Sequence, residues 1–138
     1  MANAPVALIE RIPLFAGLDG RELKAVAASL KDRTFAAGTT VVQEGESGLG
    51  FFVIESGTAR VSVGGREVRT LGPSDHFGEI ALIAGTPRTA TITAESDVSC
   101  YGMTVWDFRG VVESNPSLAW KLLQSLAKGL VEAEHREH

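Results

Sequence analysis

The sequence predicts a mainly β domain with helices at both ends. Apolar residues recur at helical spacing over residues 6–31, short β-type segments fill residues 33–103, and helical spacing returns over residues 104–137. The length of 138 residues suits one domain, and the hydrophobic content of 44% is high enough for a buried core. We therefore expect a single domain over residues 1–138 that runs helix, antiparallel β unit, helices.

The first helical segment is expected to contain two pieces, separated around residues 17–20. Asp19 is the predicted N-cap of the second piece, and Glu22 lies three residues later, where a capping-box partner belongs. The apolar residues at helical spacing are Leu8, Ile9, Ile12, Leu23, Val26, Ala27 and Leu30.

The middle segment is rich in Val, Ile, Thr and Phe and is interrupted by Gly, Pro and Asp. Its strand-like pieces are "TTVVQEG", "FFVIES", "TARVSVGG", "EVRTLG", "TATITAE" and "SCYGMT". Regular short strands with glycine turns indicate a sandwich or barrel, and Gly64-Gly65 is the expected hairpin turn. Cys100 is interpreted as a buried strand residue, and Arg60, Arg66 and Arg69 are assigned to exposed strand faces.

Two helices are expected after Met103. The first begins at a Thr104 cap and ends at Asn115-Pro116, since proline disfavours a helical residue before it. The last helix carries a wide apolar stripe, formed by Leu118, Trp120, Leu122, Leu123, Leu126, Ala127, Leu130 and Val131.

Composition excludes several classes of protein. A net charge of −4 and a pI of about 5.4 argue against a general nucleic-acid binder. Cys100 is the only cysteine, so neither an intrachain disulfide nor a cysteine-rich zinc site is expected. The N-terminus lacks the features of a signal peptide, and no apolar run approaches the ~18 residues of a membrane span. We expect a cytoplasmic protein.

Catalysis and metal binding are not indicated. The histidines, His76, His135 and His138, do not form a metal-ligand cluster on predicted strands. The sequence also shows no Ser/His/Asp or paired-carboxylate arrangement with local support. The domain is therefore expected to be neither an enzyme nor a metalloprotein.

The stretch "HFGEIALIAGTPRTATITA", residues 76–94, has the residues of an anion site. Gly78 permits close approach of the backbone, and the helical turn after it offers free N–H groups. Arg88 carries a planar guanidinium that matches phosphate, while Glu79 is a good acceptor for a sugar hydroxyl. Spacing alone leaves two interpretations open: a pocket for a phosphate bonded to a ribose, or an exposed ion pair beside a turn.

Residues 77–91 resemble the phosphate-binding cassette of cyclic nucleotide-binding domains. The family pattern F-G-E-(I/L)-A-L-(I/L), a short turn and (P)-R-(T/A/S)-A is matched without a gap. Residues 45–61 and Leu71-Gly72-Pro73 also match, so the resemblance covers nearly the whole chain. It implies an antiparallel β-barrel or jelly roll. One departure is Ser74-Asp75, where the family often has Gly-Asp, and His76 takes a commonly apolar position that we expect to be structural or exposed.

The resemblance assigns roles within the cassette. Glu79 would accept the ribose 2′-OH, Arg88 would hold an exocyclic phosphate oxygen, and Thr89 would place a hydroxyl near the phosphate or base. Leu82 would couple the cassette to mobile C-terminal helices. The backbone N–H groups of Gly78, Ile80, Ala81 and Ala90 would complete the anion site, and the candidates for the wall over the base are Val61, Val63, Val68 and Leu71.

The function implied is that of a regulatory sensor for a cyclic nucleotide. Cyclic AMP is the expected ligand, and cyclic GMP is the alternative because Thr89 can meet the guanine amino group. Ligand binding would move the C-terminal helices, with Trp120 or Leu123 covering the base, and would act on an effector protein or domain. The competing interpretation is a protein interaction module with this fold and no bound nucleotide.

Overall fold

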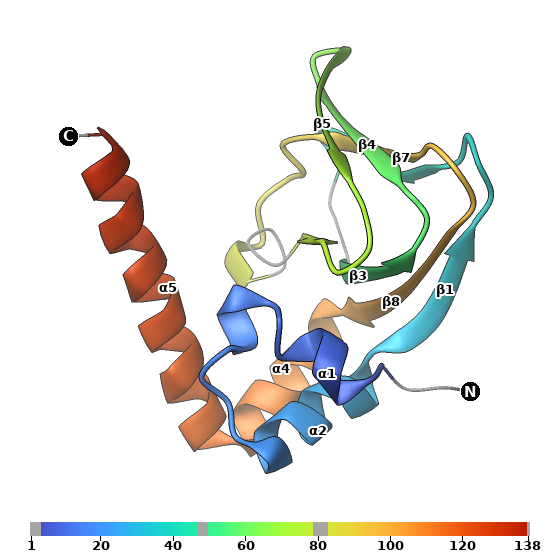
Figure 1. Cartoon of the computed structure of the whole chain (residues 1–138). Coiled ribbons are helices and arrows are strands. Elements are labelled where there is room, and N and C mark those ends of the chain that lie inside the picture. The colour runs from blue at the N-terminus through green and yellow to red at the C-terminus, as the bar shows by residue number, and fades with distance from the viewer. Residues whose placement is uncertain (1–3, 47–49, 79–82, 138) are drawn as a thin grey trace.

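The computed structural model describes residues 4–46, 50–78 and 83–137. Among these residues, eight strands form two antiparallel four-stranded sheets with the orders β1-β8-β3-β6 and β2-β7-β4-β5, and helices precede and follow them (Figure 1). The predicted fold class is confirmed. The elements are α1 (Val6–Ile9), the 3-10 helix η1 (Pro13–Phe15), α2 (Gly20–Ser29), β1 (Lys31–Phe35), β2 (Thr40–Val42), β3 (Gly50–Ser56), β4 (Ala59–Val63), β5 (Arg66–Leu71), β6 (His76–Phe77), β7 (Thr91–Ala94), β8 (Val98–Thr104), α4 (Val105–Ser114) and α5 (Pro116–Glu137).

Strand β3 separates two hydrophobic cores. Phe51 and Val53 belong to the core shared with the helices, whereas Ile54 belongs to the core of the β sandwich. Successive side chains of a strand point to opposite faces, so a strand covered on both faces is apolar throughout. The run "FFVI" therefore marks the strand that faces the helices on one side and the β sandwich on the other.

Several local predictions are confirmed. Asp19 caps α2 in a capping box, and Thr104 caps α4 by accepting a hydrogen bond from the Asp107 N–H at 3.1 Å. Gly64-Gly65 forms the β4–β5 hairpin turn with both φ angles positive. Cys100 is buried, and burial raises the pKa of its thiol to about 11. One boundary differs, because β1 begins at Lys31, inside the segment predicted as helical.

Ser74 has a φ of +75°, in the left-handed region where a Cβ is disfavoured. Its N–H donates to the carbonyl of Ile54 at 2.8 Å, which holds the turn between β5 and β6 against β3. This backbone conformation accounts for the glycine that the family often has at this position.

The helices pack as a layer beside the sheet that contains β3. Leu118 and Leu122, near the start of α5, are buried in the core shared with α2 and η1. The rest of α5 extends upward beside the β sandwich (Figure 1), and Leu130 is 68% exposed. The predicted apolar stripe is thus core only over the first turns of the helix. Within the described residues, no helix is both long and apolar enough to cross a membrane.

Candidate nucleotide-binding site

A cavity of about 480 Å³ lies between the sheet that contains β4 and β5 and two segments of the chain, residues 75–78 and residues 86–90. Residues 75–78 and 86–90 form one part of its wall, and strands form the rest. We call it the β-sandwich cavity. Its lining is Val42, Val61, Arg69, Leu71, Asp75, His76, Phe77, Gly78, Thr86, Pro87, Arg88, Thr89, Ala90 and Ile92.

Arg88 is fixed at this cavity by both its backbone and its side chain. Its N–H donates to the Glu46 carbonyl at 3.0 Å, and its own carbonyl accepts from the Gly45 N–H at 2.8 Å. The Nη2 atom donates to the carbonyl of Gly50, the first residue of β3. The residue is only 6% exposed, so the structure places a buried cation at the wall of the cavity in a protein with net negative charge.

Gly78 makes room for the Arg88 guanidinium. Its φ is +97°, and a Cβ built at this position would lie 2.5 Å from the Arg88 Nη1 atom and 2.6 Å from the Gly50 carbonyl oxygen. Distances this short leave no space for a side chain. The sequence suggested close approach of the Gly78 backbone to a phosphate, and here the group that approaches it is Arg88.

The other predicted site residues divide into three groups. Thr89 and Ala90 line the cavity, as do the wall candidates Val61 and Leu71. Val63 and Val68, the other two wall candidates, are 45% and 53% exposed and are not among the residues that line this cavity. Glu79, Ile80, Ala81 and Leu82 lie outside the described residues.

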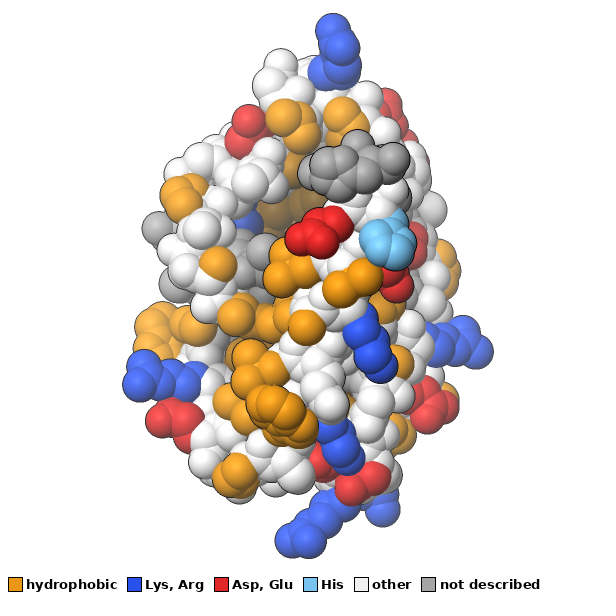
Figure 2. Space-filling model, turned by 90° about the vertical axis from the view of Figure 1, so that its left-hand side faces the viewer, with side chains coloured by type: hydrophobic (Ala, Val, Ile, Leu, Met, Phe, Trp, Pro, Cys, Tyr) orange, Lys and Arg blue, Asp and Glu red, His pale blue; other side chains and the backbone are white. Residues whose placement is uncertain are grey.

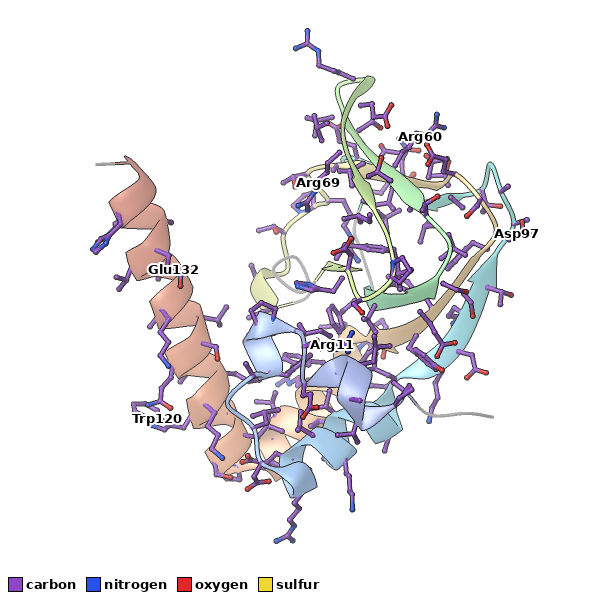
Figure 3. The ribbon with its side chains drawn as sticks, viewed as in Figure 1. Arg11, Arg60, Arg69, Asp97, Trp120 and Glu132 are labelled. Carbon is purple, nitrogen blue, oxygen red and sulfur yellow. The ribbon has the colours of Figure 1, made fainter. Side chains whose placement is uncertain are left out.

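Arg69 is the site residue that sequence reasoning missed. The sequence predicted only that Arg69 lies on an exposed strand face. It is exposed, and it also lines the β-sandwich cavity (Figure 3). Two signals point to it in retrospect. It lies two residues before Leu71 on β5, which places both on one face, and its cross-strand partner is Val61.

His76 also lines the cavity and is partly buried. Its ring centroid lies 6.2 Å from that of Phe51, so it contacts the core shared with the helices. His76 therefore has the structural role expected for it, and it also lies at the cavity.

Helix α5 does not cover the cavity in this structure. The residues suggested for that role, Trp120 and Leu123, are 63% and 57% exposed, and neither lines it. Figure 2 shows apolar side chains along α5 and a recess beside the helix.

A second cavity, of about 470 Å³, shares Arg88 with the first. Its other lining residues include Lys31 and Arg33 of β1, Phe52 of β3 and Asp107 of α4. Arg88 is thus a common wall of two cavities. No group of three or more His, Cys, Asp or Glu side chains suited to a metal ion occurs in the part of the chain that the structure describes.

Two curated relatives have much longer chains, and each matches this chain over part of its length. The chain is 36% identical over 99 residues to the cAMP-dependent protein kinase regulatory subunit of Candida albicans, covering 72% of this chain and 22% of that protein. It is 39% identical over 89 residues to the cGMP-dependent protein kinase of Toxoplasma gondii, covering 64% of this chain and 9% of that protein. The chain therefore spans less than a quarter of the length of either relative.

Solved structures match over almost all of the chain. The N-terminal domain of a transcriptional regulator from Streptomyces coelicolor A3(2) superposes with a TM-score of 0.87 and 29% identity, covering 95% of both chains. A structure described as cAMP-bound PfPKA-R (141–441) gives a TM-score of 0.70 and 26% identity, covering 94% of this chain and 46% of that one. Residues 32–115 match the family described as cyclic nucleotide-binding domain, and the chain belongs to that family.

Proposed function

We propose that this domain binds a purine cyclic nucleotide in the β-sandwich cavity and works as a regulatory, non-catalytic sensor. The observation that carries the proposal is the buried guanidinium of Arg88 at the wall of a cavity of about 480 Å³. This volume is within the range of small-molecule sites, about 300–1,000 Å³. A guanidinium offers N–H donors in a planar fork that matches phosphate, so a cyclic phosphate is a suitable ligand at this wall.

The roles within the site follow the family resemblance. Arg88 holds an exocyclic phosphate oxygen, and Glu79 accepts the ribose 2′-OH. Thr89, which lines the cavity, adds a hydroxyl near the phosphate or base. The N–H groups of Gly78, Ile80, Ala81 and Ala90 complete the anion site, and Leu82 relays its occupation to the C-terminal helices.

Cyclic AMP is the ligand expected from the sequence, and Arg69 is the observation that favours cyclic GMP. Guanine presents two neighbouring acceptors, O6 and N7, that a guanidinium can meet with two hydrogen bonds. Adenine presents an acceptor and a donor at the same edge, so it suits arginine less well. Arg69 lines the cavity together with Thr89, whose hydroxyl can meet the guanine amino group.

Signalling is proposed to involve closure of α5 over the base. The described residues of α5 leave the cavity open, and the exposed apolar side chains Trp120, Leu123 and Leu130 would gain burial on closure. A ligand shifts such an equilibrium only by its differential affinity for the two states. The moved helix would then act on an effector protein or domain.

Calorimetric titration with cyclic AMP and cyclic GMP tests the phosphate site. Saturable binding is expected, and Arg88→Ala is expected to weaken it by about 2–5 kcal/mol because a buried phosphate loses its charged partner. Arg66→Ala is the matched control, since Arg66 is exposed on β5 and does not line the cavity. Unchanged affinity in Arg88→Ala would remove the phosphate role, and no binding of either nucleotide would favour the interaction module.

The same titrations identify the base. If Arg69 and Thr89 read guanine, Arg69→Ala and Thr89→Ala should each weaken cyclic GMP more than cyclic AMP, by about 0.5–3 kcal/mol. Arg60→Ala on the neighbouring strand is the control, because Arg60 is exposed and outside the lining. Equal losses for the two ligands would show that neither residue reads the base.

A further inference from the structure

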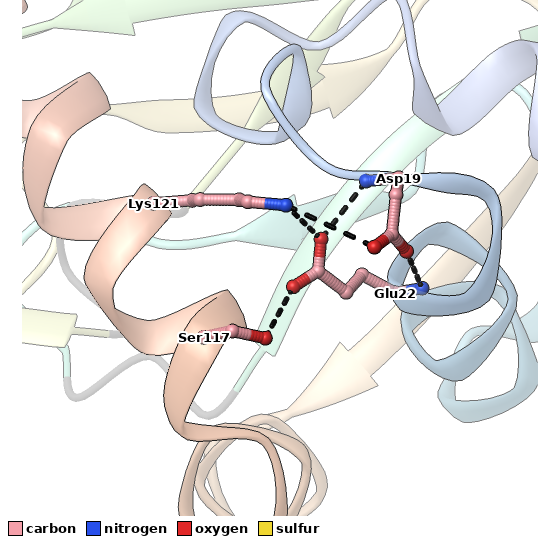
Figure 4. A network of polar contacts seen from close by, with 4 residues as sticks. All are labelled: Asp19, Glu22, Ser117 and Lys121. Atoms are coloured by element: carbon pink, nitrogen blue, oxygen red, sulfur yellow. Dashed lines mark hydrogen bonds and ion pairs between the residues drawn. The ribbon is translucent and has the colours of Figure 1, made fainter.

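Helix α5 is joined to α2 by a buried carboxylate. Glu22 is 4% exposed, and both of its oxygens accept hydrogen bonds from α5: Oε2 from the Ser117 hydroxyl at 2.7 Å and Oε1 from the Lys121 ammonium at 2.6 Å (Figure 4). Oε1 also accepts the Asp19 N–H at 2.9 Å, which closes the capping box of α2. We call Asp19, Glu22, Ser117 and Lys121 the Glu22 clamp.

The Glu22 clamp is sensitive to the loss of any one partner. A carboxylate removed from water is stable only while its hydrogen-bond donors stay in place. The hydrogen bond from Lys121, followed by those from Asp19 and Ser117, lowers the pKa of Glu22 to about 2, so these donors outweigh the cost of burial. Losing one donor would leave the buried carboxylate short of a hydrogen bond, which costs stability.

The clamp fixes only the first turns of α5. Leu118 and Leu122 are buried on the same part of the helix as Ser117 and Lys121. Beyond them Leu130 and Val131 are exposed, and the helix extends away from the helical layer (Figure 1). The direction of α5 is therefore set at its base.

Tilting α5 relative to α2 strains the clamp. Pro116 opens the helix, and at 1.5 Å per residue Lys121 lies about 7–8 Å along the axis. A tilt of about 30° around Pro116 would move position 121 by roughly 4 Å, which exceeds the length of a hydrogen bond. A closing movement that begins at the base of α5 therefore works against the contact between Glu22 and Lys121.

We infer that the Glu22 clamp is an autoinhibitory contact: it holds α5 away from the β-sandwich cavity and lowers the apparent affinity for nucleotide. The inference rests on the proposed nucleotide binding and on closure of α5. The apparent affinity of a ligand scales with the fraction of protein in the competent state, so weakening the clamp raises the affinity without changing any residue at the cavity.

Nucleotide titration of Lys121→Met tests the clamp, because methionine keeps the unbranched chain and removes the ammonium. The apparent Kd is expected to fall about tenfold, and Glu22→Gln should have a similar effect. Lys24→Met is the matched control, since Lys24 is an exposed lysine on α2 with no ion pair among the described residues. Unchanged or weakened binding in a folded Lys121→Met variant would overturn the inference.

A distance measurement without nucleotide separates this inference from the proposed function. Spin labels at Arg60→Cys on β4 and Lys128→Cys on α5 report the separation of helix and β sandwich, and the native Cys100 is buried. Adding Lys121→Met is expected to shift or broaden the distribution, whereas Lys24→Met should leave it unchanged. If the chain binds neither nucleotide, the proposed function fails, and this distribution still decides whether the clamp positions α5. An unchanged distribution in Lys121→Met would refute the clamp.

Discussion

Gly78 and Arg88 form a pair in which each residue determines what the other can be. The space that a Cβ would occupy at position 78 is taken by the guanidinium of Arg88, and the backbone of Gly78 has a φ of +97°. Glycine is therefore required here for its dihedral angle and for its two close neighbours, the Arg88 guanidinium and the Gly50 carbonyl oxygen. Only the contact with the guanidinium depends on Arg88.

A double-mutant cycle isolates the contribution of the Arg88 side chain. Gly78→Ala is expected to lower the free energy of unfolding by about 2 kcal/mol or more, because it adds a collision to an unfavourable φ. In the Arg88→Ala background the collision with the guanidinium is absent while that with the Gly50 carbonyl oxygen remains, so the cost of the same change should fall by about 1 kcal/mol or more. Urea denaturation measures the four proteins. Additive losses would show that the Arg88 side chain does not contact position 78.

The sequence identified Arg88 but not how it is held. The motif and the residue type were enough to predict a cation for a phosphate. Arg69 could also have been predicted, because alternation along β5 places it on the same face as Leu71. The bond from Arg88 to the carbonyl of Gly50 joins positions 38 residues apart. No local pattern contains such a contact, because it depends on how β3 and the segment around residue 88 pack together.

At the scale of elements, caps were predictable and burial along α5 was not. Asp19 and Thr104 act on N–H groups within their own first turn, so local sequence determines them. The apolar stripe of α5 has the same spacing throughout, yet Leu118 is buried and Leu130 exposed. Burial depends on where the neighbouring helices end, which the spacing within α5 does not encode.

The contact between α2 and α5 should be lost in acid. The hydrogen bonds from Lys121, Asp19 and Ser117 together lower the pKa of Glu22 from 4.5 to about 2. A carboxyl whose pKa is lower in the folded than in the unfolded state stabilises the fold at pH values above its unfolded pKa. This stabilisation is lost as the pH falls from about 4.5 to 2. Since Lys121 is partly exposed, solvent screening reduces the effect, and we expect about 1–2 kcal/mol.

Unfolding free energies of the native chain and Glu22→Gln between pH 7 and pH 2 measure this loss. The difference between the two proteins should shrink as the pH falls through the window, because a protonated glutamate resembles glutamine. A difference that stays constant with pH would show that the ionised form of Glu22 is not the stabilising one.

At the scale of the whole molecule, the β sandwich and the helical layer share one wall, β3. Its first residue, Gly50, accepts the bond from Arg88 and pairs with Thr104, the cap of α4. The proposed phosphate site is thus one hydrogen bond away from the strand pair that leads into the C-terminal helices. The two-core architecture was predictable only in part. Strands and helices could be located from periodicity, but periodicity did not identify β3 as the strand that contacts both hydrophobic cores.

Bound nucleotide should stabilise the whole domain. At a free concentration one hundred times Kd, binding adds about 2.7 kcal/mol to the free energy of unfolding, which raises Tm by about 10 °C for a chain of this size. Thermal unfolding with each cyclic nucleotide, compared with 5′-AMP and 5′-GMP as controls, measures the shift. A Tm that neither cyclic nucleotide raises would contradict the proposed function.

The shared space of Gly78 and Arg88 also implies an order of events in evolution. A lineage that gains a side chain at position 78 while Arg88 is present suffers the collision at once, so that step is selected against. A lineage that first shortens residue 88 removes this collision, so a later change at position 78 costs less, although its φ and the Gly50 carbonyl oxygen still disfavour a side chain there. Among descendants that abandon ligand binding, we expect some with Gly78 but no arginine at position 88, and almost none with the reverse combination.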